Sequence, residues 1–457
     1  MHLEFISNTG FYLEHNGRVL GMDLWLTQGP FEGSWFHFPP LRQTKYLVSD
    51  CDVIYISHIH PDHFDLLALS EASKDTVFIV PNYMNCLLER KLRANGFENI
   101  HSLAPNEDVT LDGDLNIRMF GQFVNNLFED AAFGSLIDSA ILISWDGRTI
   151  LNCNDNYLNA KAAEMVCIEY PDIDLALMPH SASGPYPASF RNLSQEDKNG
   201  EVTRLQTQYI DHFVDMTKIV NPRLVVPCAA EYVVVGRLHE KNKNIGLASA
   251  DEAADKVNAI TGNDGLRSKA VRLDCGTILD IDSGDISGLP LRHFTDQERD
   301  EFAARLCEVP FPYDWEQSCN DIGEFDILMD AARAHMWTAQ GRLDWKQDYN
   351  VYLCLNEKPA YHLNFSESKV TKLTDVEVKR QEPYLDCFLS HQLLYAILVR
   401  KAHWNNAEGG LHIDFYRAPN TYVPEVFTLM AFLHVPVDVN KGDEDRIRPN
   451  FQPINPQ

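Results

Sequence analysis

The sequence predicts an α/β protein in which two β-sheets pack face to face with helices on their outer sides, followed by an α+β region. Strand-like apolar runs alternate with stretches of helical period along residues 1–288, which suits sheets layered between helices. A histidine-rich turn, residues 58–63, follows the apolar run 52–57, and such strand ends carry functional loops. Residues 289–457 mix helical and strand-like stretches without a chemical motif.

Individual elements follow from local signals. Asp146-Gly147 stands between two apolar runs and predicts a tight hairpin turn. Gly96 predicts the end of the helix before it. The expected elements, in chain order, are short strands within 1–60, a helix start at 66–73, a strand at 76–81, a helix near 84–95, a hairpin over 140–153, a strand at 171–179, a helix over 201–219 and a strand at 224–230.

A domain boundary is expected near residue 288. The segment Ile281–Pro290, IDSGDISGLP, is rich in Gly, Ser and Asp, as linkers are. A chain of 457 residues also exceeds what one hydrophobic core usually holds. We therefore predict a first domain over residues 1–288 and an accessory α+β region over residues 289–457.

The bulk properties narrow the class of partner. A formal charge of −27 argues against nucleic acid, because phosphate binding needs a basic surface. The sequence has no apolar run of about 18 residues, so we expect no membrane span. It has no basic and apolar leader, and its ten cysteines form no C-x-x-C pair. These features predict a cytoplasmic protein with a small-molecule substrate.

The histidine-rich turn predicts a metal site. It reads His-x-His-x-Asp-His, with His58, His60, Asp62 and His63. Three imidazoles and a carboxylate within six residues would each cost several kcal/mol if buried unpaired. Divalent cations remove that cost. We expect His58 and His60 to reach one cation, and Asp62 and His63 to reach a second one beside it.

This turn resembles the signature of the metallo-β-lactamase fold, an αββα sandwich. The stretch Gly21–Thr27 and the following GPFEGSWFHFPP resemble a subgroup that contains lactonase-like proteins and the catalytic domain of CMP-N-acetylneuraminate hydroxylase. IDSAILISWDGRTILNCNDN, ASGPYPASF and LVVPCAAEYVVVGRLHEKNKN extend the resemblance to about residue 290, and LLYAILVRKAHWNNAEGGLHIDFYRAPNTYVPEVF continues it weakly. The resemblance therefore implies a catalytic first domain.

The resemblance implies further metal ligands. In this fold an aspartate at the place of Asp155 bridges two metals, since its two oxygens can bind both. The family histidine expected between residues 120 and 138 is missing, and Glu129, Asp130 and Asp138 are the candidate replacements. His180 and His239 stand where related proteins often supply late ligands. A carboxylate in place of an imidazole favours iron or manganese over zinc.

The sequence also offers candidates for substrate binding, although no motif marks them as the histidine-rich turn marks the metal ligands. Arg237 and Lys241, with Lys243, form a basic group in an acidic protein and are candidates to hold a phosphate or carboxylate. Trp35 and His37 lie in an aromatic loop and are candidates to face the substrate. These residues predict a small polar or anionic metabolite as substrate.

Two enzymatic functions remain open at the level of sequence. The first is an oxygenase or hydroxylase with two divalent metal ions, iron favoured, in which Asp155 holds the pair together. The hydroxylase carries a Rieske centre, but no C-x-H…C-x-x-H pattern occurs here, so this function implies an external electron donor. The alternative is a binuclear metallohydrolase of the lactonase or phosphodiesterase type, with zinc or manganese as further candidates, in which Asp62 orients the attacking water.

Overall fold

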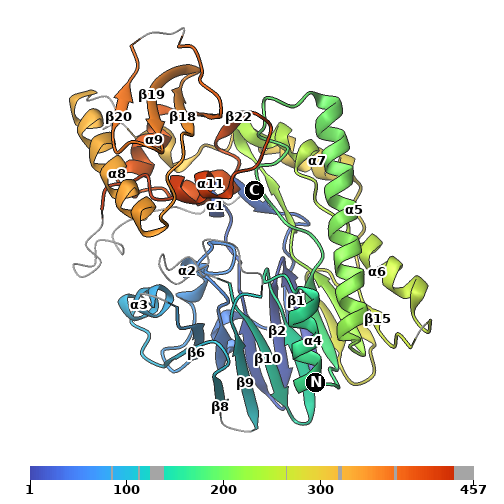
Figure 1. Ribbon diagram of the computed structural model, residues 1–457. Coiled ribbons are helices and arrows are strands. Elements are labelled where there is room, and N and C mark those ends of the chain that lie inside the picture. Colours follow the sequence, from blue (N-terminus) through green and yellow to red (C-terminus); the bar gives the residue numbers. More distant parts are fainter. Residues whose placement is uncertain are drawn as a thin grey trace.

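Two large β-sheets form the first part of the protein (Figure 1). The computed structural model describes residues 1–83, 86–111, 114–123, 138–263, 265–316, 322–374 and 378–436. One sheet has the strand order β17-β16-β1-β2-β3-β5-β6-β7, and the other has the order β15-β13-β12-β11-β10-β9-β8. A two-stranded ribbon pairs β4 with β14.

The strands of the first sheet are β1 His2–Ser7, β2 Gly10–His15, β3 Arg18–Met22, β5 Val53–Tyr55, β6 Val77–Pro81, β7 Ile100–Leu103, β16 Thr277–Asp280 and β17 Ile286–Gly288. Those of the second sheet are β8 Asp108–Leu111, β9 Leu115–Phe120, β10 Ala140–Trp145, β11 Arg148–Asn152, β12 Leu175–Pro179, β13 Leu224–Cys228 and β15 Lys269–Ala270. The ribbon strands are β4 Trp35–His37 and β14 Tyr232–Val234.

The helices are α1 Pro30–Gly33, α2 Leu66–Leu69, α3 Leu87–Ala94, α4 Ala160–Glu169, α5 Gln195–Val220, α6 Ala250–Ile260, α7 Asp296–Arg305, α8 Ile322–Arg342, α9 His391–Leu398, α10 Trp404–Gly409 and α11 Pro424–Met430. Short 3-10 turns are η1 Val48–Asp50, η2 Gly236–Asn244 and η3 Pro312–Trp315. No described helix combines the length and the apolar character that crossing a membrane would require.

Both faces of each sheet are covered, which explains the continuous apolar runs of the central strands. Leu175 and Leu177 point from β12 into the core between the sheets, whereas Ala176 and Met178 pack against outer helices. Helices α4, α5 and α6 cover the second sheet, and α2 and α3 cover the first. The αββα sandwich that the sequence predicted is therefore confirmed. Its last strand, β17, ends at Gly288.

Local signals located most elements but not all boundaries. The Asp146-Gly147 hairpin joins β10 to β11, with both turn residues at positive φ (45° and 73°), as the sequence predicted. Helix α5 begins at Gln195, six residues before the expected start at residue 201. The reason is a capping box in which the Ser194 and Asp197 side chains each bond the other residue's backbone N–H, a signal that the helical period alone does not contain.

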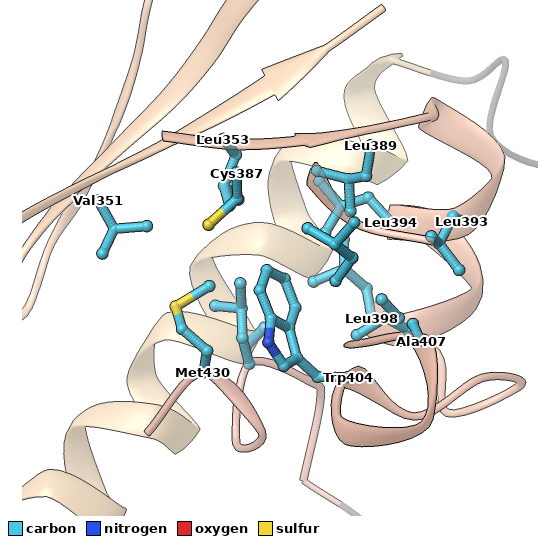
Figure 2. Packing of buried hydrophobic residues seen from close by; sticks show 14 of the residues in the cluster. Val351, Leu353, Cys387, Leu389, Leu393, Leu394, Leu398, Trp404, Ala407 and Met430 are labelled. Carbon is cyan, nitrogen blue, oxygen red and sulfur yellow. The ribbon is translucent and has the colours of Figure 1, made fainter. Parts of the chain in front are cut away.

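The C-terminal region is built on a separate core. Its sheet has the order β20-β19-β18-β21-β22, with β18 Asn350–Leu355, β19 Lys358–Asn364, β20 Val370–Lys372, β21 Tyr384–Leu389 and β22 Asp414–Ala418. Helices α8, α9 and α11 lie against this sheet (Figure 1). Figure 2 shows Trp404 of α10 surrounded by aliphatic side chains and Met430, and the indole is 1% exposed. This packing fixes α10 firmly to the C-terminal core.

The two regions meet through α1 and α10 at one end of the sandwich. His412 Nε2 lies 3.0 Å from the Phe31 carbonyl oxygen, and the Trp35 indole N–H donates to the Gly409 carbonyl at 3.3 Å. The backbone N–H of His403 donates to the Glu32 carboxylate at 3.1 Å. The segment 403–412 is therefore anchored to the loop 31–35 of the sandwich at several points.

Candidate metal centre

The histidine-rich turn lies at the end of β5, inside the rim of the sandwich. β5 pairs in parallel with β3 and β6, so its carboxyl end opens toward the edge of the sheet. His58 and His63 are both 1% exposed, and their ring centroids lie 4.0 Å apart. His60 lies against them, with its ring centroid 4.7 Å from that of His58. The structure thus brings all three imidazoles together at the end of β5.

Asp155 joins this cluster from the second sheet. It follows β11, which ends three residues earlier at Asn152, so the aspartate stands on the turn rather than on the strand. His58, His63 and Asp155 each present one ligand atom, and these atoms all lie within 4.8 Å of one another. The distance from His63 Nε2 to Asp155 Oδ2 is 3.3 Å, and that to Asp62 Oδ2 is 3.4 Å.

Several buried polar atoms of the cluster have no hydrogen-bond partner among the described residues. They are His63 Nε2, Asp62 Oδ1 and Asp155 Oδ1. An unsatisfied buried polar group costs roughly 1–3 kcal/mol, and more when it is charged. Two donor atoms that bind one cation at 2.0–2.1 Å lie about 2.9–3.4 Å apart, which matches the separations here. The donor set therefore fits a divalent cation.

A buried carboxylate orients His63. Asp23 Oδ2 lies 2.9 Å from His63 Nδ1, and Asp23 also accepts the Ser57 hydroxyl proton at 2.7 Å. Because a carboxylate only accepts, His63 carries its proton on Nδ1 and turns the Nε2 lone pair toward Asp62 and Asp155. Sequence reasoning missed Asp23, although the residue stands in the segment that carries the resemblance.

The same network orients His58. The Ser57 hydroxyl has already given its proton to Asp23, so it accepts from His58 Nδ1 at 2.9 Å. The Nε2 lone pair of His58 is then available to a cation. Asn8, which sequence reasoning also missed, donates to Asp62 Oδ2 at 2.9 Å and holds that carboxylate in place. No local pattern marks Asn8, because its partner lies far along the chain.

Electrostatics favour positive charge at this spot. Burial opposes protonation of His63, but the surrounding carboxylates of Asp62, Asp155 and Asp23 outweigh it and raise the pKa of His63. Burial lowers the pKa of His58 well below its usual value, and its histidine neighbours lower it further. His58 is therefore neutral, as a ligand must be.

Asp138 lies beside the cluster, where the missing family histidine was expected. Its Oδ1 is 3.7 Å from His58 Nε2. Of the three candidate replacements, Glu129 and Asp130 lie outside the described residues. A cavity of about 350 Å³ borders Asp138 and Asp155 and is also lined by Gln122, Asn156, Tyr157, Ala182 and Tyr209. This cavity gives the cluster room for a small molecule.

Two other predicted ligands have contacts that do not favour metal binding. His180 lies between backbone carbonyls, with Nδ1 2.8 Å from Cys228 O and Nε2 3.1 Å from Ala248 O. His239 lies on η2, with Nδ1 3.0 Å from Gly236 O and Nε2 3.4 Å from Glu240 Oε1. Neither histidine joins the ligand group of the described residues.

The residues predicted to bind substrate are occupied by structural contacts. Trp35 is buried and stacks on Tyr232 at 3.4 Å between centroids, and His37 is buried and stacks on Trp25 at 3.8 Å. These contacts place both rings in a packed core, which does not favour a substrate-facing role.

The two predicted substrate cations also have partners. Arg237 pairs with Asp314 at 3.0 Å. Lys241 pairs with Asp414 at 2.5 Å and lines a separate cleft of about 400 Å³, together with Arg191, Lys198 and Lys243. Both bonds join the sandwich to the C-terminal region, so the cations serve that junction. Neither cation lines the cavity beside Asp155.

The sandwich, the turn at the end of β5 and the place of Asp155 beside His63 together define the fold. The protein has the metallo-β-lactamase fold.

No protein-family model matches the chain. A Mycolicibacterium smegmatis protein described as a Rieske 2Fe-2S iron–sulfur protein is 28% identical over 192 residues, which are 41% of this chain and 35% of that protein. Cytidine monophosphate-N-acetylneuraminic acid hydroxylase of Danio rerio is 22% identical over 292 residues, 61% of this chain and 46% of that protein.

Solved structures with a similar chain path include both hydrolases and a hydroxylase. Igni18, a metallo hydrolase of Ignicoccus hospitalis, is 18% identical, covers 64% of this chain and 99% of its own, and has a TM-score of 0.40. CmlA, a diiron β-hydroxylase of Streptomyces venezuelae, is 14% identical, covers 63% of this chain and 54% of its own, and has a TM-score of 0.41. This chain spans less than half the length of the curated relatives named above.

Proposed function

We propose that the protein is a metal-dependent oxygenase or hydroxylase with two divalent ions, iron favoured, that acts on a small molecule. The observation that carries the metal centre is the group of buried, unpartnered donor atoms on His63, Asp62 and Asp155. In this proposal His58, His60 and Asp138 hold one ion, Asp62 and His63 hold the other, and Asp155 is shared. When bound, iron would supply redox chemistry with dioxygen, whereas zinc would supply Lewis acidity.

The chain's own residues prepare the site in three ways. Asp23 and Ser57 lie against Nδ1 of His63 and His58 and so direct the Nε2 of each ring toward the cluster. Asn8 holds one oxygen of Asp62 and leaves Oδ1 able to take a proton. The cavity beside Asp155 would hold the substrate against Tyr157 and Tyr209, which line it. Preorganised groups of this kind lower the cost of reaching the transition state.

The preference for an oxygenase has two supports. The donor set contains three carboxylates beside three imidazoles, which suits iron better than zinc. The curated relatives bear names of a Rieske protein and a hydroxylase, although the chain spans only part of each. An oxygenase also needs electrons, so an external electron donor is part of this proposal.

A binuclear metallohydrolase is the second candidate. It is favoured by Asp62 Oδ1, which is buried beside the cluster without a hydrogen bond and is placed to orient or deprotonate a water. In this function Asp62 and Asp155 keep the same positions, and no electron donor is needed. Fold alone does not decide between the two chemistries.

Metal content and oxygen uptake separate the candidates. Protein made in iron-rich medium is analysed for iron, zinc and manganese, and then assayed for dioxygen uptake with a chemical reductant. The oxygenase proposal expects about two irons per chain and reductant-dependent uptake that a substrate accelerates. Two zincs per chain, together with hydrolysis of lactones or phosphodiesters and no oxygen uptake, would overturn it in favour of the hydrolase.

A further inference from the structure

One contact joins the C-terminal region directly to the histidine-rich turn. Asn405, on α10, places Oδ1 2.9 Å from His60 Nε2, 345 positions away in the chain. Neighbouring residues of the same helix are held by the C-terminal core, because Trp404 and Ala407 are fully packed there. Figure 2 shows both side chains turned into that core. The position of Asn405 is therefore set by the packing behind it.

This contact determines which nitrogen of His60 carries the proton. The side-chain oxygen of asparagine only accepts, so His60 Nε2 must carry the hydrogen and donate it. The opposite nitrogen, Nδ1, is then a lone pair, and it lies 2.9 Å from His58 Nε2. Ser57 independently leaves a lone pair on His58 Nε2. With these tautomers two lone pairs face each other at 2.9 Å, a separation that suits two ligands of one cation.

We propose that Asn405 is a positioning residue of the metal centre, by which the C-terminal region selects the His60 tautomer that binds metal through Nδ1. The inference rests on the proposed metal centre. It gives the C-terminal region a role in the site: without α10, His60 would be free to place its proton on Nδ1 and lose its ligand nitrogen. Outer partners of metal-bound histidines typically contribute about 10- to 100-fold to metal affinity.

The test compares metal affinity among full-length variants, with zinc as the metal and a chelating dye as competitor. Asn405→Leu removes the acceptor and is expected to weaken binding of one zinc equivalent by about tenfold or more. Asn405→Asp keeps an acceptor oxygen and is expected to retain wild-type affinity or exceed it. Asn420→Leu is the matched control, because this exposed asparagine of the same region accepts a hydrogen bond from Arg417 instead of from His60. The zinc affinity of this variant should equal that of the wild type.

A second readout reports the tautomer itself. In the zinc-loaded protein, ¹⁵N–¹H correlation of the imidazoles should show His60 protonated at Nε2 and metal-bound at Nδ1, and Asn405→Leu should lose the signal of the hydrogen-bonded Nε2–H. The inference is overturned if zinc binds His60 through Nε2, or if Asn405→Leu binds zinc as tightly as the wild type. If the wild-type protein binds no zinc, iron or manganese, the proposed function itself fails, and the inference with it.

Discussion

Two buried histidines, His412 of the C-terminal region and His63 of the sandwich, differ in how their ring nitrogens are bonded. His412 of the C-terminal region has a partner for each ring nitrogen, with Nδ1 2.7 Å from the Tyr313 hydroxyl oxygen and Nε2 3.0 Å from Phe31 O. His63 of the sandwich bonds Asp23 through Nδ1 but leaves Nε2 buried beside two carboxylates without a hydrogen bond. His412 therefore ties the two regions together, whereas the Nε2 of His63, between the carboxylates of Asp62 and Asp155, is placed to bind a cation.

The strongest test of this comparison removes one histidine of each kind from the sandwich. His63→Ala deletes the free nitrogen and is expected to lose about one metal equivalent and nearly all turnover, because metal ligands cannot be replaced by water without loss of affinity. His180→Ala deletes a histidine that faces two carbonyl oxygens and should keep its metal. Elemental analysis of the folded proteins measures both. Equal metal loss in the two variants would contradict the distinction.

A second test concerns the packing that supports Asn405. Trp404→Ala should lower the free energy of unfolding by about 3–5 kcal/mol, because it leaves a large cavity in the C-terminal core. Trp315→Ala is the control, since that indole is 74% exposed and its loss should change the free energy by about 0.5 kcal/mol or less. Denaturant unfolding checks both. A Trp404→Ala variant as stable as the control would show that α10 is not fixed by this core.

A third test uses pH at the junction of the regions. Burial raises the pKa of Glu32 to about 7, although bonds from His403 and Asn406 oppose the shift. The protonated carboxyl is thus favoured in the folded state, so its stabilising contribution is present below pH 4.5 and is lost as pH rises toward 7. Glu32→Gln removes the ionisable group and with it this loss of stability. Because Glu32 is partly exposed, we expect the free energy of unfolding to rise by about 1–2 kcal/mol at pH 8 and to change little at pH 5.

Asp274 of the sandwich is the control, because its pKa is shifted in the opposite direction from that of Glu32. Burial alone would raise its pKa, but the Arg292 guanidinium outweighs burial and lowers it. Asp274→Asn should therefore destabilise the protein at pH 8, and its effect should fade as pH falls below the usual aspartate range. Unfolding curves at both pH values separate the two carboxyls. A pH-independent effect of Glu32→Gln would mean that this carboxyl stays ionised in the folded protein.

The sequence by itself determined the features that depend on neighbours in the chain. Apolar runs bounded by turn residues marked the strands of the sandwich, and Asp146-Gly147 marked the hairpin, because these signals act over a few residues. The spacing of His58, His60 and His63 was sufficient to predict a metal turn at a strand end. Asp155 was placed near it only through the family resemblance.

Only the tertiary structure decided which groups support that turn and which are used elsewhere. Asn8, Asp23 and Asn405 reach the histidine-rich turn from distant segments, and a single hydrogen bond between distant residues leaves no period or motif in a sequence. The same reason explains why the use of Arg237 and Lys241 could not be predicted. Their charge suggested that they bind a substrate, but their partners, Asp314 and Asp414, lie across the junction of the two regions. Charge is a property of one residue, whereas its use depends on what the fold places within about 3 Å of it.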